Sequence, residues 1–584
     1  MTAASGVTDR RLDLLVAGAG PTGLTLALQA VDHGARVRIV ERHAQPVRPS
    51  RTLLMHPRSL ELLRPLGVTD ALISRGDTSM VVRLHRGSRV AEVALGRLEL
   101  AGTAFPFLLL LRQADVEEVL EAALAARGVP VERGVEVARV ARVGNGGALA
   151  VVRGEGRPDE VVRCRYLVGC DGPASLVRRS VGSWLGDDYD QEVVLADVEL
   201  GGAAAAAGPG SGRAVGPEQL QPGAMHIGIG RSGLAAMVHL GERAGWRMLS
   251  TRPAGADGHP LGSPGPSVPR EDLQLLLDGA GLPAPIAGVA WSAAVPAQHY
   301  LASRFSRGPL FVAGEAAHVH ASAGAQGVNA GIHDAVNLGW KLAFAAAAGR
   351  AAAGAGAVGG SGAGAGAGAG AGDAIALGTP TGALAARPGS ALLASYAEER
   401  RPADRSVLRL THLVFQAASS GHPLAQAGRL VLAPLTIPLL PWLARRPRIV
   451  AASVRRLAQF RLRYPHSPLS MEVQTSLLPV RGGLARRGLR PGSRVADALV
   501  RCAGQRVRLH ELLAGPGVHI LLQADARAVP ERMLGPLVHA YRLDDRPGTG
   551  MLVVRPDGYV ALRAPVLDEV HLAAWLRLVG LTVR

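Results

Sequence analysis

The stretch that decides the fold runs from Leu12 to Glu41 and reads LDLLVAGAGPTGLTLALQAVDHGARVRIVE. An apolar run, Leu12 to Ala17, is followed by the glycine-rich turn Gly18 to Gly23, a helical pattern and a second, alternating strand. This order predicts a βαβ unit. The N-terminus of its helix would present free N–H groups and the positive end of the helix dipole to the turn, which suits a bound anion.

The turn matches the pattern GxGxxG, and each glycine has a physical role. Gly18 permits the tight turn, Gly20 lets the backbone approach a pyrophosphate, and Gly23 lets the helix pack against the strand. Glu41 ends the second strand, 21 residues after Gly20, where a carboxylate can accept hydrogen bonds from ribose hydroxyls. We therefore expect a dinucleotide here, although this pattern alone does not separate FAD from NAD.

Length and composition indicate a globular, multidomain protein. With 584 residues the chain is long enough for roughly two or three domains. The net charge of +17 would ordinarily suggest nucleic acid or an anionic membrane as a partner, but the arginines are spread along the chain, so we expect neither. The three cysteines show no CxxC or metal-ligand spacing, which disfavours a disulfide framework or a zinc site and favours a reducing cytoplasm.

The longest apolar stretch, Leu430 to Ala444, has 15 residues and three prolines, fewer than the ~20 residues that a spanning helix needs. We therefore expect no membrane span, and the first apolar run does not read as a signal peptide. The Ala/Gly-rich segment 345–390 is predicted to be a flexible loop. After it, Leu392 to Arg401 predicts an amphipathic helix that ends in ERRP.

The positions of further strand patterns predict an interrupted first domain. The runs Val161 to Val168 and Pro309 to Ala313 resemble buried strands of one α/β domain, although they lie far apart in the sequence. Leu195 to Leu200 and Gly233 to Leu240 predict strands of a mostly antiparallel insertion. We expect an α/β domain from 1–185 and 296–400, an inserted sheet domain at 186–295, a helical connection at 401–478 and a C-terminal α/β domain at 479–584.

Two later motifs add a family resemblance. YLVGCDGPASLVRR, residues 166–179, delivers Asp171 and Gly172 to the start of a helix, and LFVAGEAAHVHASAGAQGVNAGIHDAVNLGWKL, residues 310–342, delivers Gly314 and Glu315 to a turn. With GAGPTG these stretches resemble the three-part fingerprint of the flavoprotein monooxygenases related to para-hydroxybenzoate hydroxylase. SRTLLMHPRSLELL, LRQADVEEVLEAAL and LLASYAEERRP are similar to other family segments, so the resemblance covers nearly the whole chain.

The resemblance implies a fold. The first domain would be a glutathione-reductase-like FAD-binding domain with an inserted β-sheet substrate domain. GSRVADALV and RPDGYVALR resemble the thioredoxin-like tail of the larger phenol and polyketide hydroxylases. Because this tail lacks CxxC, we expect it to be structural, with no redox role.

The resemblance also implies an activity. In such enzymes FAD is bound non-covalently, NADPH or NADH reduces it, and dioxygen forms a flavin C4a-hydroperoxide that hydroxylates an aromatic ring, here a polycyclic polyketide-type substrate. The cofactor carries the chemistry, so no acid or base residue of the protein is needed. Two alternatives stay open: a Baeyer–Villiger or epoxidising oxygenase on the same scaffold, and a non-catalytic FAD-binding partner in a pathway. The protein is expected to be a monomer or a homodimer.

The resemblance and the motifs together assign candidate site residues. The adenosine and pyrophosphate would be held by Gly18, Gly20, Pro21, Thr22, Gly23, Glu41 and Arg42. The rest of the cofactor would be served by Arg112, Gln113, Asp171, Gly314 and Glu315, with Arg51 near the flavin and the nicotinamide path. The flavin ring would meet the main chain of Gly327, Val328 and Asn329, and the substrate would lie near Met225, His226 and Ile227.

This chain departs from the family pattern in two places. Glu315 stands where the family has aspartate, and Ser322 with Gly324-Ala325 stands where a proline and paired glycines are usual. A Cβ at Ala325 would restrict a backbone that approaches a ring. These departures support the alternative of a non-catalytic FAD-binding protein. His318 and His320 are interpreted as hydrogen-bonding loop residues, and no metal is expected.

Overall fold

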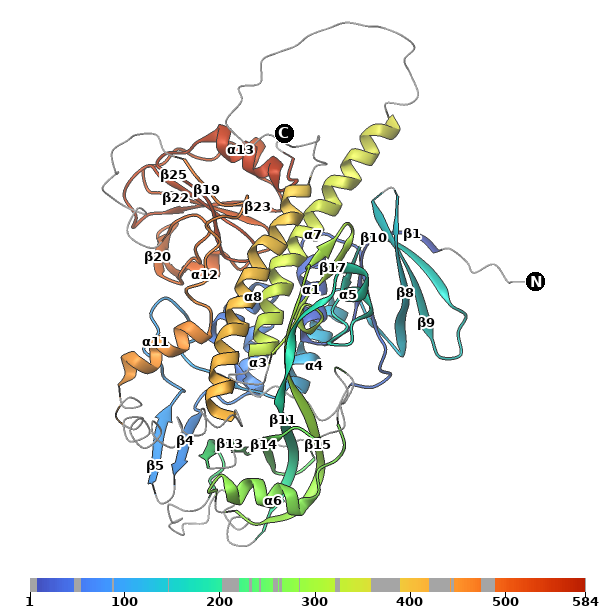
Figure 1. Cartoon of the computed structure of the whole chain (residues 1–584). Helices are drawn as coiled ribbons and strands as arrows, with labels where there is room; N and C mark the ends of the chain where they lie inside the picture. Colours follow the sequence, from blue (N-terminus) through green and yellow to red (C-terminus); the bar gives the residue numbers. More distant parts are fainter. Residues whose placement is uncertain are drawn as a thin grey trace, which may run out of the picture.

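The computed structural model describes most of the chain, and its described strands form three large sheets and two two-stranded ones, with helices between them (Figure 1). The described residues are 8–46, 54–86, 89–144, 146–201, 220–230, 234–240, 243–255, 261, 265–282, 284–320, 326–358, 389–419, 442, 446–473 and 489–582. Arg51, Ser322, Gly324 and Ala325 therefore lie outside the described residues, as does the apolar stretch 430–444 apart from Trp442.

The first sheet is built around the predicted βαβ unit. Its strand order is β16-β17-β10-β1-β2-β7, and β1 pairs in parallel with both β2 and β10. A hairpin of β8 and β9 joins the sheet through β10. The strands are β1 (Thr8–Ala17), β2 (Val37–Glu41), β7 (Val131–Arg133), β8 (Val135–Val143), β9 (Gly147–Gly154), β10 (Glu160–Gly169), β16 (Ser306–Arg307) and β17 (Leu310–Val312).

Helix α7 (Gln326–Val358) packs against helix α1 (Pro21–Asp32), and both contribute buried residues to the core of the first sheet. A Cβ at Gly339 of α7 would lie 2.7 Å from the Gln29 Cβ of α1, so glycine lets the two helices approach closely. Two further helices belong to this part, α4 (Gln113–Ala126) and α5 (Leu176–Val181).

Two predictions about helix ends are wrong. Helix α7 continues into the Ala/Gly segment as far as Val358, because alanine has the highest helix propensity of all residues. Helix α8 (Ser390–Ser419) does not end at ERRP but runs through Pro402. A proline inside a helix costs a hydrogen bond, and here the buried ion pair of Arg400 with Asp334 of α7 and the packing of Leu408 hold the helix on both sides of it. Residues 359–388 lie outside the described part.

The second sheet has the order β18-β15-β11-β14-β13-β12-β4-β5 and is mostly antiparallel, as expected. One pairing is a surprise: β4 and β5, which precede the predicted insertion, join this sheet because β4 pairs in parallel with β12. Helix α6 (Arg270–Gly279) covers one face. The strands are β4 (Val81–Arg86), β5 (Arg89–Ala94), β11 (Trp184–Leu200), β12 (Ala224–Ile229), β13 (Leu234–Val238), β14 (Trp246–Pro253), β15 (Ile286–Ala302) and β18 (His318–Val319).

The third sheet lies in the C-terminal part and has the order β19-β25-β24-β22-β23. Its core includes Trp575 of α13 (Glu569–Leu578) and also Trp340 and Phe344 of α7, so this part packs directly on the long helix. The strands are β19 (Met471–Glu472), β22 (Val518–Gln523), β23 (Val538–Leu543), β24 (Met551–Val554) and β25 (Val560–Ala564), with a separate hairpin of β20 (Leu499–Cys502) and β21 (Gln505–Arg508).

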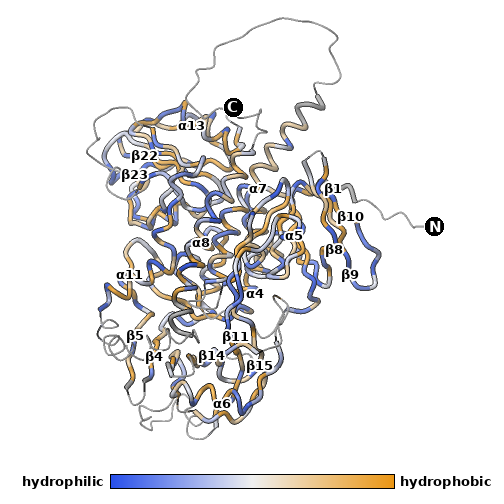
Figure 2. Tube along the Cα trace, in the orientation of Figure 1, coloured by the Kyte–Doolittle hydropathy of each residue, from blue (hydrophilic) through white to orange (hydrophobic). Residues whose placement is uncertain are grey.

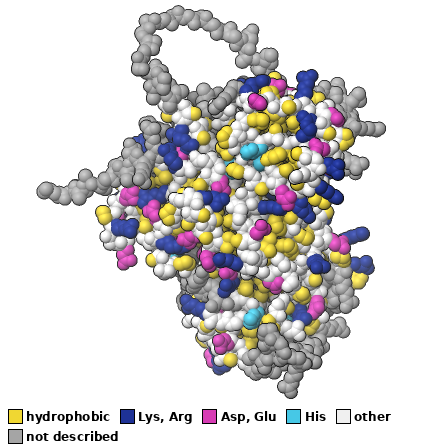
Figure 3. Space-filling view, turned by 180° about the vertical axis from the view of Figure 1, so that it is seen from behind, with side chains coloured by type: hydrophobic (Ala, Val, Ile, Leu, Met, Phe, Trp, Pro, Cys, Tyr) yellow, Lys and Arg dark blue, Asp and Glu magenta, His cyan; other side chains and the backbone are white. Residues whose placement is uncertain are grey.

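The surface and the helices agree with the composition. On the face that Figure 3 shows, Lys and Arg side chains are interspersed with Asp and Glu and do not gather in one patch. Figure 2 shows hydrophilic residues interspersed along helix α8. Among the described residues, no helix is both long enough and apolar enough to cross a bilayer.

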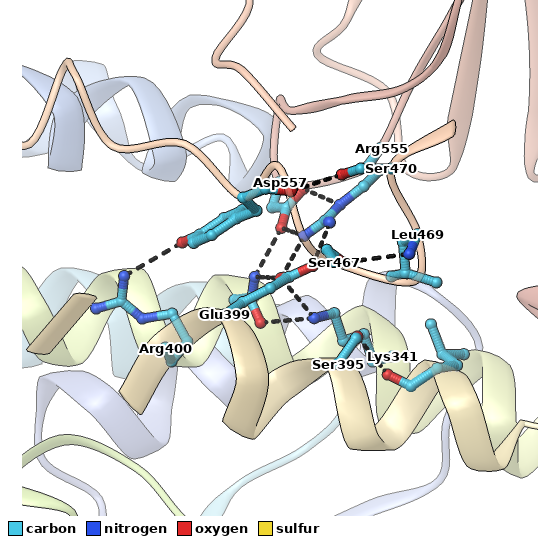
Figure 4. A network of polar contacts seen from close by, with 12 residues as sticks. Lys341, Ser395, Glu399, Arg400, Ser467, Leu469, Ser470, Arg555 and Asp557 are labelled. Carbon is cyan, nitrogen blue, oxygen red and sulfur yellow. Dashed lines mark hydrogen bonds and ion pairs between the residues drawn. The ribbon is translucent and has the colours of Figure 1, made fainter. Parts of the chain in front are cut away.

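A buried polar network joins the C-terminal part to helices α7 and α8 (Figure 4). Glu399 of α8 accepts hydrogen bonds from Lys341 Nζ at 2.8 Å, from Asn337 Nδ2 at 2.7 Å and from both terminal nitrogens of Arg555 at 2.6 and 2.8 Å. Asp557 accepts from Asn337 Nδ2 at 3.0 Å and also pairs with Arg555. The carboxylates of Glu399 and Asp557 together therefore compensate two buried cations, Lys341 of α7 and Arg555 of the C-terminal part.

Glu399→Gln removes the charge that compensates Lys341 and Arg555. Breaking a buried ion pair on one side leaves an uncompensated charge, so we expect unfolding to cost about 3 kcal/mol less than in the wild type. Urea unfolding followed by circular dichroism measures this. The neighbouring exposed residue provides a matched control, Glu398→Gln, with an expected change within about 0.5 kcal/mol. Equal losses in the two variants would contradict a special role of Glu399.

Candidate functional site

Three motifs far apart in the sequence meet at one edge of the first sheet. Strands β1, β10 and β17 are parallel neighbours, and their carboxyl ends are in register, with Ala17 beside Gly169 and Gly169 beside Val312. The backbone continues this contact beyond the strands, because Cys170 N donates to Ala17 O at 2.7 Å and Ala313 N donates to Gly169 O at 3.0 Å. The carboxyl edge of parallel strands is where open α/β sheets bind ligands.

The glycines of GAGPTG occupy three different environments. Gly18 has φ of 99°, and a Cβ there would lie 2.3 Å from Cys170 O, so only glycine fits. A Cβ on Gly23 would lie 2.0 Å from Gly18 O, which makes glycine necessary for helix α1 to pack on the turn. A Cβ on Gly20 would meet nothing within 4 Å. The backbone at Gly20 therefore borders open space, while its neighbours are closely packed.

The start of helix α1 contributes N–H groups beside the open space at Gly20, and Glu41 contributes a carboxylate. Pro21 is the first helical residue, and Leu24 N donates to Gly20 O, which leaves the N–H groups of Thr22 and Gly23 without an intrahelical acceptor. Glu41 accepts hydrogen bonds from Ala19 N at 2.9 Å and from His43 N at 3.0 Å.

The environment of Glu41 keeps its carboxylate ionised. Burial alone would raise the pKa of Glu41, but these backbone bonds and the His43 ring, with Nδ1 2.8 Å from Glu41 Oε1, hold the pKa below its ordinary value. Arg42, next along the chain, is exposed.

The turn after β17 packs against the same helix start. Cβ atoms built on Gly314 and Gly331 would lie 2.5 and 2.2 Å from the Thr22 hydroxyl oxygen, so a glycine of the turn after β17 and a glycine of α7 close around this side chain. Glu315 is exposed, and its Oε1 atom lies 3.8 Å from the position of a Cβ on Gly327. The carboxylate of Glu315 therefore stands beside the first turn of α7, where Gly327 and Val328 lie.

Asp171 caps helix α5 with one oxygen and leaves the other free. Its Oδ2 accepts from Leu176 N at 2.8 Å, whereas its buried Oδ1 has no hydrogen-bond partner among the described residues. Burial raises the pKa of Asp171 above the ordinary range of aspartate. The adjacent Gly172 has φ of 77° and borders open space.

Asn329 has a role that the sequence did not indicate. We expected a main-chain contact only, yet its side chain fastens the segment before helix α2 (Pro57–Leu63). Asn329 Oδ1 accepts from His56 N at 2.9 Å and from Ser59 Oγ at 2.6 Å, and Nδ2 donates to Leu54 O at 3.1 Å.

Arg112 and Gln113 begin helix α4 close to this segment. Leu54 lies in strand β3 (Leu54–Met55), which pairs with β6 (Leu109–Leu110), and Arg112 and Gln113 follow β6 by two and three residues. Their side chains bond to Asp115 and Glu117 within the same helix.

The three candidate substrate residues do not share a face, because side chains alternate along a strand. Met225 and Ile227 belong to an apolar cluster with Val82 and with residues of α11 (Pro447–Leu457). His226 points to the opposite face, is fully buried and lies 2.9 Å from His85 by its Nδ1 atom. The assignment of His226 to a substrate surface is therefore corrected: it is a structural residue beneath that sheet.

Asp334 of α7 is the residue that the motif reading missed. Its Oδ2 accepts from Gly314 N at 3.0 Å and lies 2.8 Å from His318 Nε2, and its Oδ1 accepts from Arg400 Nε at 2.7 Å. Arg400 also donates to Asp404 at 2.6 Å, and His320 Nε2 lies 2.8 Å from His318 Nδ1. The i, i+4 spacing of Arg400 and Asp404 in ERRPAD was the available signal, but their partner could not be read from it.

This cluster also bears on the histidine pair. His318, Asp334 of α7 and Asp404 of α8 place possible ligand atoms within 4.8 Å of one another. The Arg400 guanidinium bonds to both carboxylates and already supplies a cation there. The arrangement is therefore a self-compensated ion network rather than an open coordination site.

A separate cavity of about 520 Å³ lies between α8 and the ends of β11 and β15. Leu301, one of its lining residues, pairs with His318, so the cavity is one strand away from the ion network. The volume is within the range that small-molecule pockets usually have. Its other lining residues include Leu185, His299, Leu408 and His412.

The model of the FAD binding domain family matches residues 11–354. This range includes the GAGPTG turn with Glu41, the turn at Asp171-Gly172 and the turn at Gly314-Glu315, which we call the cradle. The chain belongs to this family. The match covers more than half of the chain and runs from the first strand of the βαβ unit into helix α7.

Individual proteins similar to this chain are flavin-dependent or other monooxygenases and a hydroxylase. The chain is 36% identical over 333 residues to 6-methylpretetramide 4-monooxygenase of Streptomyces rimosus, which is 56% of this chain and 55% of that protein, so the match spans about half of the relative's length. It is 26% identical to a flavin-dependent monooxygenase of Mycobacteroides abscessus over 94% and 97% of the two chains. The anhydrotetracycline hydroxylase of Streptomyces rimosus superposes with a TM-score of 0.68 at 25% identity, covering 98% and 99%.

The residues of the cradle fit FAD. Open space borders Gly20 where a pyrophosphate would approach, the helix start adds two N–H groups without an intrahelical acceptor and the positive end of its dipole, and Glu41 is held ionised nearby. The unpartnered Asp171 Oδ1 and the open backbone at Gly172 continue this edge toward Gly314.

Gly20→Val tests the cradle without disturbing the protein core. A Cβ at this position has no protein atom within 4 Å, so we expect little change in the stability of the apoprotein, while FAD affinity falls by at least tenfold because the pyrophosphate loses its approach. Titration by flavin fluorescence and a melting curve of the apoprotein measure the two effects. The matched control is Gly144→Val in the β8–β9 loop, which also borders open space and should leave FAD binding intact. Undiminished FAD affinity in Gly20→Val would place the pyrophosphate elsewhere.

Asp404→Asn tests the ion network through its pH dependence. Burial and the Asp334 carboxylate raise the pKa of Asp404 to about 7 against the pull of Arg400. A raised carboxyl pKa adds stability that is complete below about 4 and is lost as the pH rises through about 7. The wild type should therefore lose stability relative to Asp404→Asn between pH 5 and pH 8 in urea unfolding. For the control Asp70→Asn, at an exposed position, the free energy of unfolding should vary with pH in parallel with that of the wild type. If the curve of Asp404→Asn were also parallel to that of the wild type, the raised pKa of Asp404 would be contradicted.

Proposed function

We propose that the protein is an FAD-dependent monooxygenase that uses NADPH or NADH and dioxygen to hydroxylate a polycyclic aromatic substrate. The observation that carries this proposal is the convergence of GAGPTG, the DG turn and the GE turn at one sheet edge. Similarity to a flavin-dependent monooxygenase over nearly the entire length of both chains supports extending the proposal beyond the FAD-binding part.

The chain's own residues would bind and orient. Gly18, Gly20, Gly23 and Glu41 hold the dinucleotide end, and the main chain at Gly327, Val328 and Asn329 meets the ring. Reduced FAD supplies the oxygen-activating chemistry when it is bound. Asn329 fastens the segment 54–59 beside the ring site through three hydrogen bonds, so this wall is pre-organised.

The substrate would be apolar and flat. The face of the second sheet that carries Met225 and Ile227 is lined with hydrophobic side chains, including Val82 and Val238. Such a surface favours ring stacking and excludes water from the reacting atoms. Two of the relatives named above are a 6-methylpretetramide monooxygenase and an anhydrotetracycline hydroxylase, which supports a multi-ring substrate for this chain.

The experiment uses the purified chain with its bound flavin. NADPH and NADH oxidation is followed with and without a panel of polycyclic phenols, and products are analysed by mass spectrometry. Substrate-stimulated NADPH or NADH consumption and a product heavier by one oxygen are expected, with the product's ring structure distinguishing hydroxylation from ring expansion. A bound flavin that neither nucleotide reduces with any substrate would instead support a non-catalytic FAD-binding protein.

A further inference from the structure

Gln459 combines backbone strain with a buried, unsatisfied side chain. It follows helix α11 and has φ of 58°, and Ala503 is the other non-glycine residue of the described chain with positive φ. The left-handed conformation costs an ordinary residue roughly 1–2 kcal/mol. The side chain is 8% exposed, and neither its Oε1 nor its Nε2 has a hydrogen-bond partner in the described structure. Both features reduce stability, and such positions cluster at ligand-binding sites.

A second unsatisfied amide lies at the same junction. Gln326 is the first residue of α7 and is 2% exposed. Its Nε2 donates to the carbonyl oxygen of Leu457 at 3.1 Å, whereas its Oε1 has no partner among the described residues. Leu457 ends α11, two residues before Gln459, so this hydrogen bond ties the Gln326 amide to the end of the helix that Gln459 follows.

The junction stands between the proposed ring site and the apolar sheet face. Gln326 directly precedes Gly327, Val328 and Asn329, which we propose to meet the flavin ring. On the other side, Ala451 and Val454 of α11 and the neighbouring Phe460 belong to the apolar cluster that contains Met225 and Ile227. A substrate on that face would therefore have its ring edge close to these amides.

We infer that Gln459 and Gln326 form a polar subsite for a substrate edge that carries a hydrogen-bond acceptor beside a donor. A carbonyl next to a phenolic hydroxyl and a primary carboxamide both have this chemistry. A Gln amide offers donors through nitrogen and an acceptor through oxygen, so Gln459 pairs with both atoms of such an edge, and Gln326 Oε1 accepts a further proton. The inference rests on the proposed function and makes Gln459 a residue that determines specificity.

Gln459→Gly provides an unusually clean test. Glycine adopts positive φ without cost, so the variant should be at least as stable as the wild type, and its loss of binding cannot be attributed to misfolding. Ala503→Gly is the matched control, because it removes the same kind of strain from the hairpin β20–β21. Melting temperature and retained FAD are measured first, and both variants should keep their flavin.

Binding is then measured by quenching of the bound flavin's fluorescence, without turnover. The probes are an anthraquinone-type ring with a hydroxyl beside its carbonyl, the same ring system with a primary carboxamide, and the parent ring without either edge. Gln459→Gly should bind both edge-bearing probes at least tenfold more weakly than the wild type and the parent ring equally well. Ala503→Gly should bind all three as the wild type does.

The outcomes separate the two proposals. If Gln459→Gly matches the wild type on every probe, the subsite is refuted while the monooxygenase proposal stands. If only one edge-bearing probe loses affinity, that edge is the group recognised. A wild-type protein that holds FAD but binds none of the ring systems refutes the proposed substrate class, and the subsite with it.

Discussion

The arrangement of the candidate site depends on the hydrogen bonds and ion pairs of one buried carboxylate, that of Asp334. It holds the backbone of Gly314, the ring of His318 and the guanidinium of Arg400, and so connects the turn after β17, strand β18 and helix α8 to helix α7. A fully buried charge is tolerated only when its partners are in place. Asp334, 20 positions further along the chain, therefore fixes where Gly314 lies relative to Thr22. In this way it also holds the turn after β17 against the start of helix α1.

The same helix connects the C-terminal part to the site. Asn337 and Lys341 lie one and two turns beyond Asp334 and bond to Glu399, which in turn pairs with Arg555. Arg58 of α2 donates to the carbonyl oxygen of Asp557 at 2.9 Å, and α2 is also fastened by Asn329. The turn at 555–558 thus contacts both α2 and the buried network of α7 and α8. The C-terminal part, whose sequence contains no CxxC pair, therefore stabilises the packing of helices α2, α7 and α8.

Local patterns predicted the parts of the fold that are made by neighbouring residues. The βαβ unit of Leu12 to Glu41, the strands ending at Gly169 and Val312 and the mostly antiparallel second sheet were all readable from hydrophobic periodicity and glycine placement. Errors arose where distant contacts outweigh local preference. Helix α8 runs through Pro402 because Arg400 is anchored to α7. Strand β4 joins the second sheet by pairing with β12, and this pairing could not be predicted locally because the two strands lie more than 130 residues apart in the sequence.

By itself, the sequence determined the dinucleotide cradle, because a tight turn, a close backbone approach and a helix start each demand a particular residue at a particular spacing. Only the tertiary structure decided which side chains face one another across the site. His226 turned out to lie beneath the sheet, Asn329 became a fastening side chain, and Asp334 became the centre of an ion network. These roles depend on strand register and helix packing, which bring together residues whose types and spacing carry no local signal.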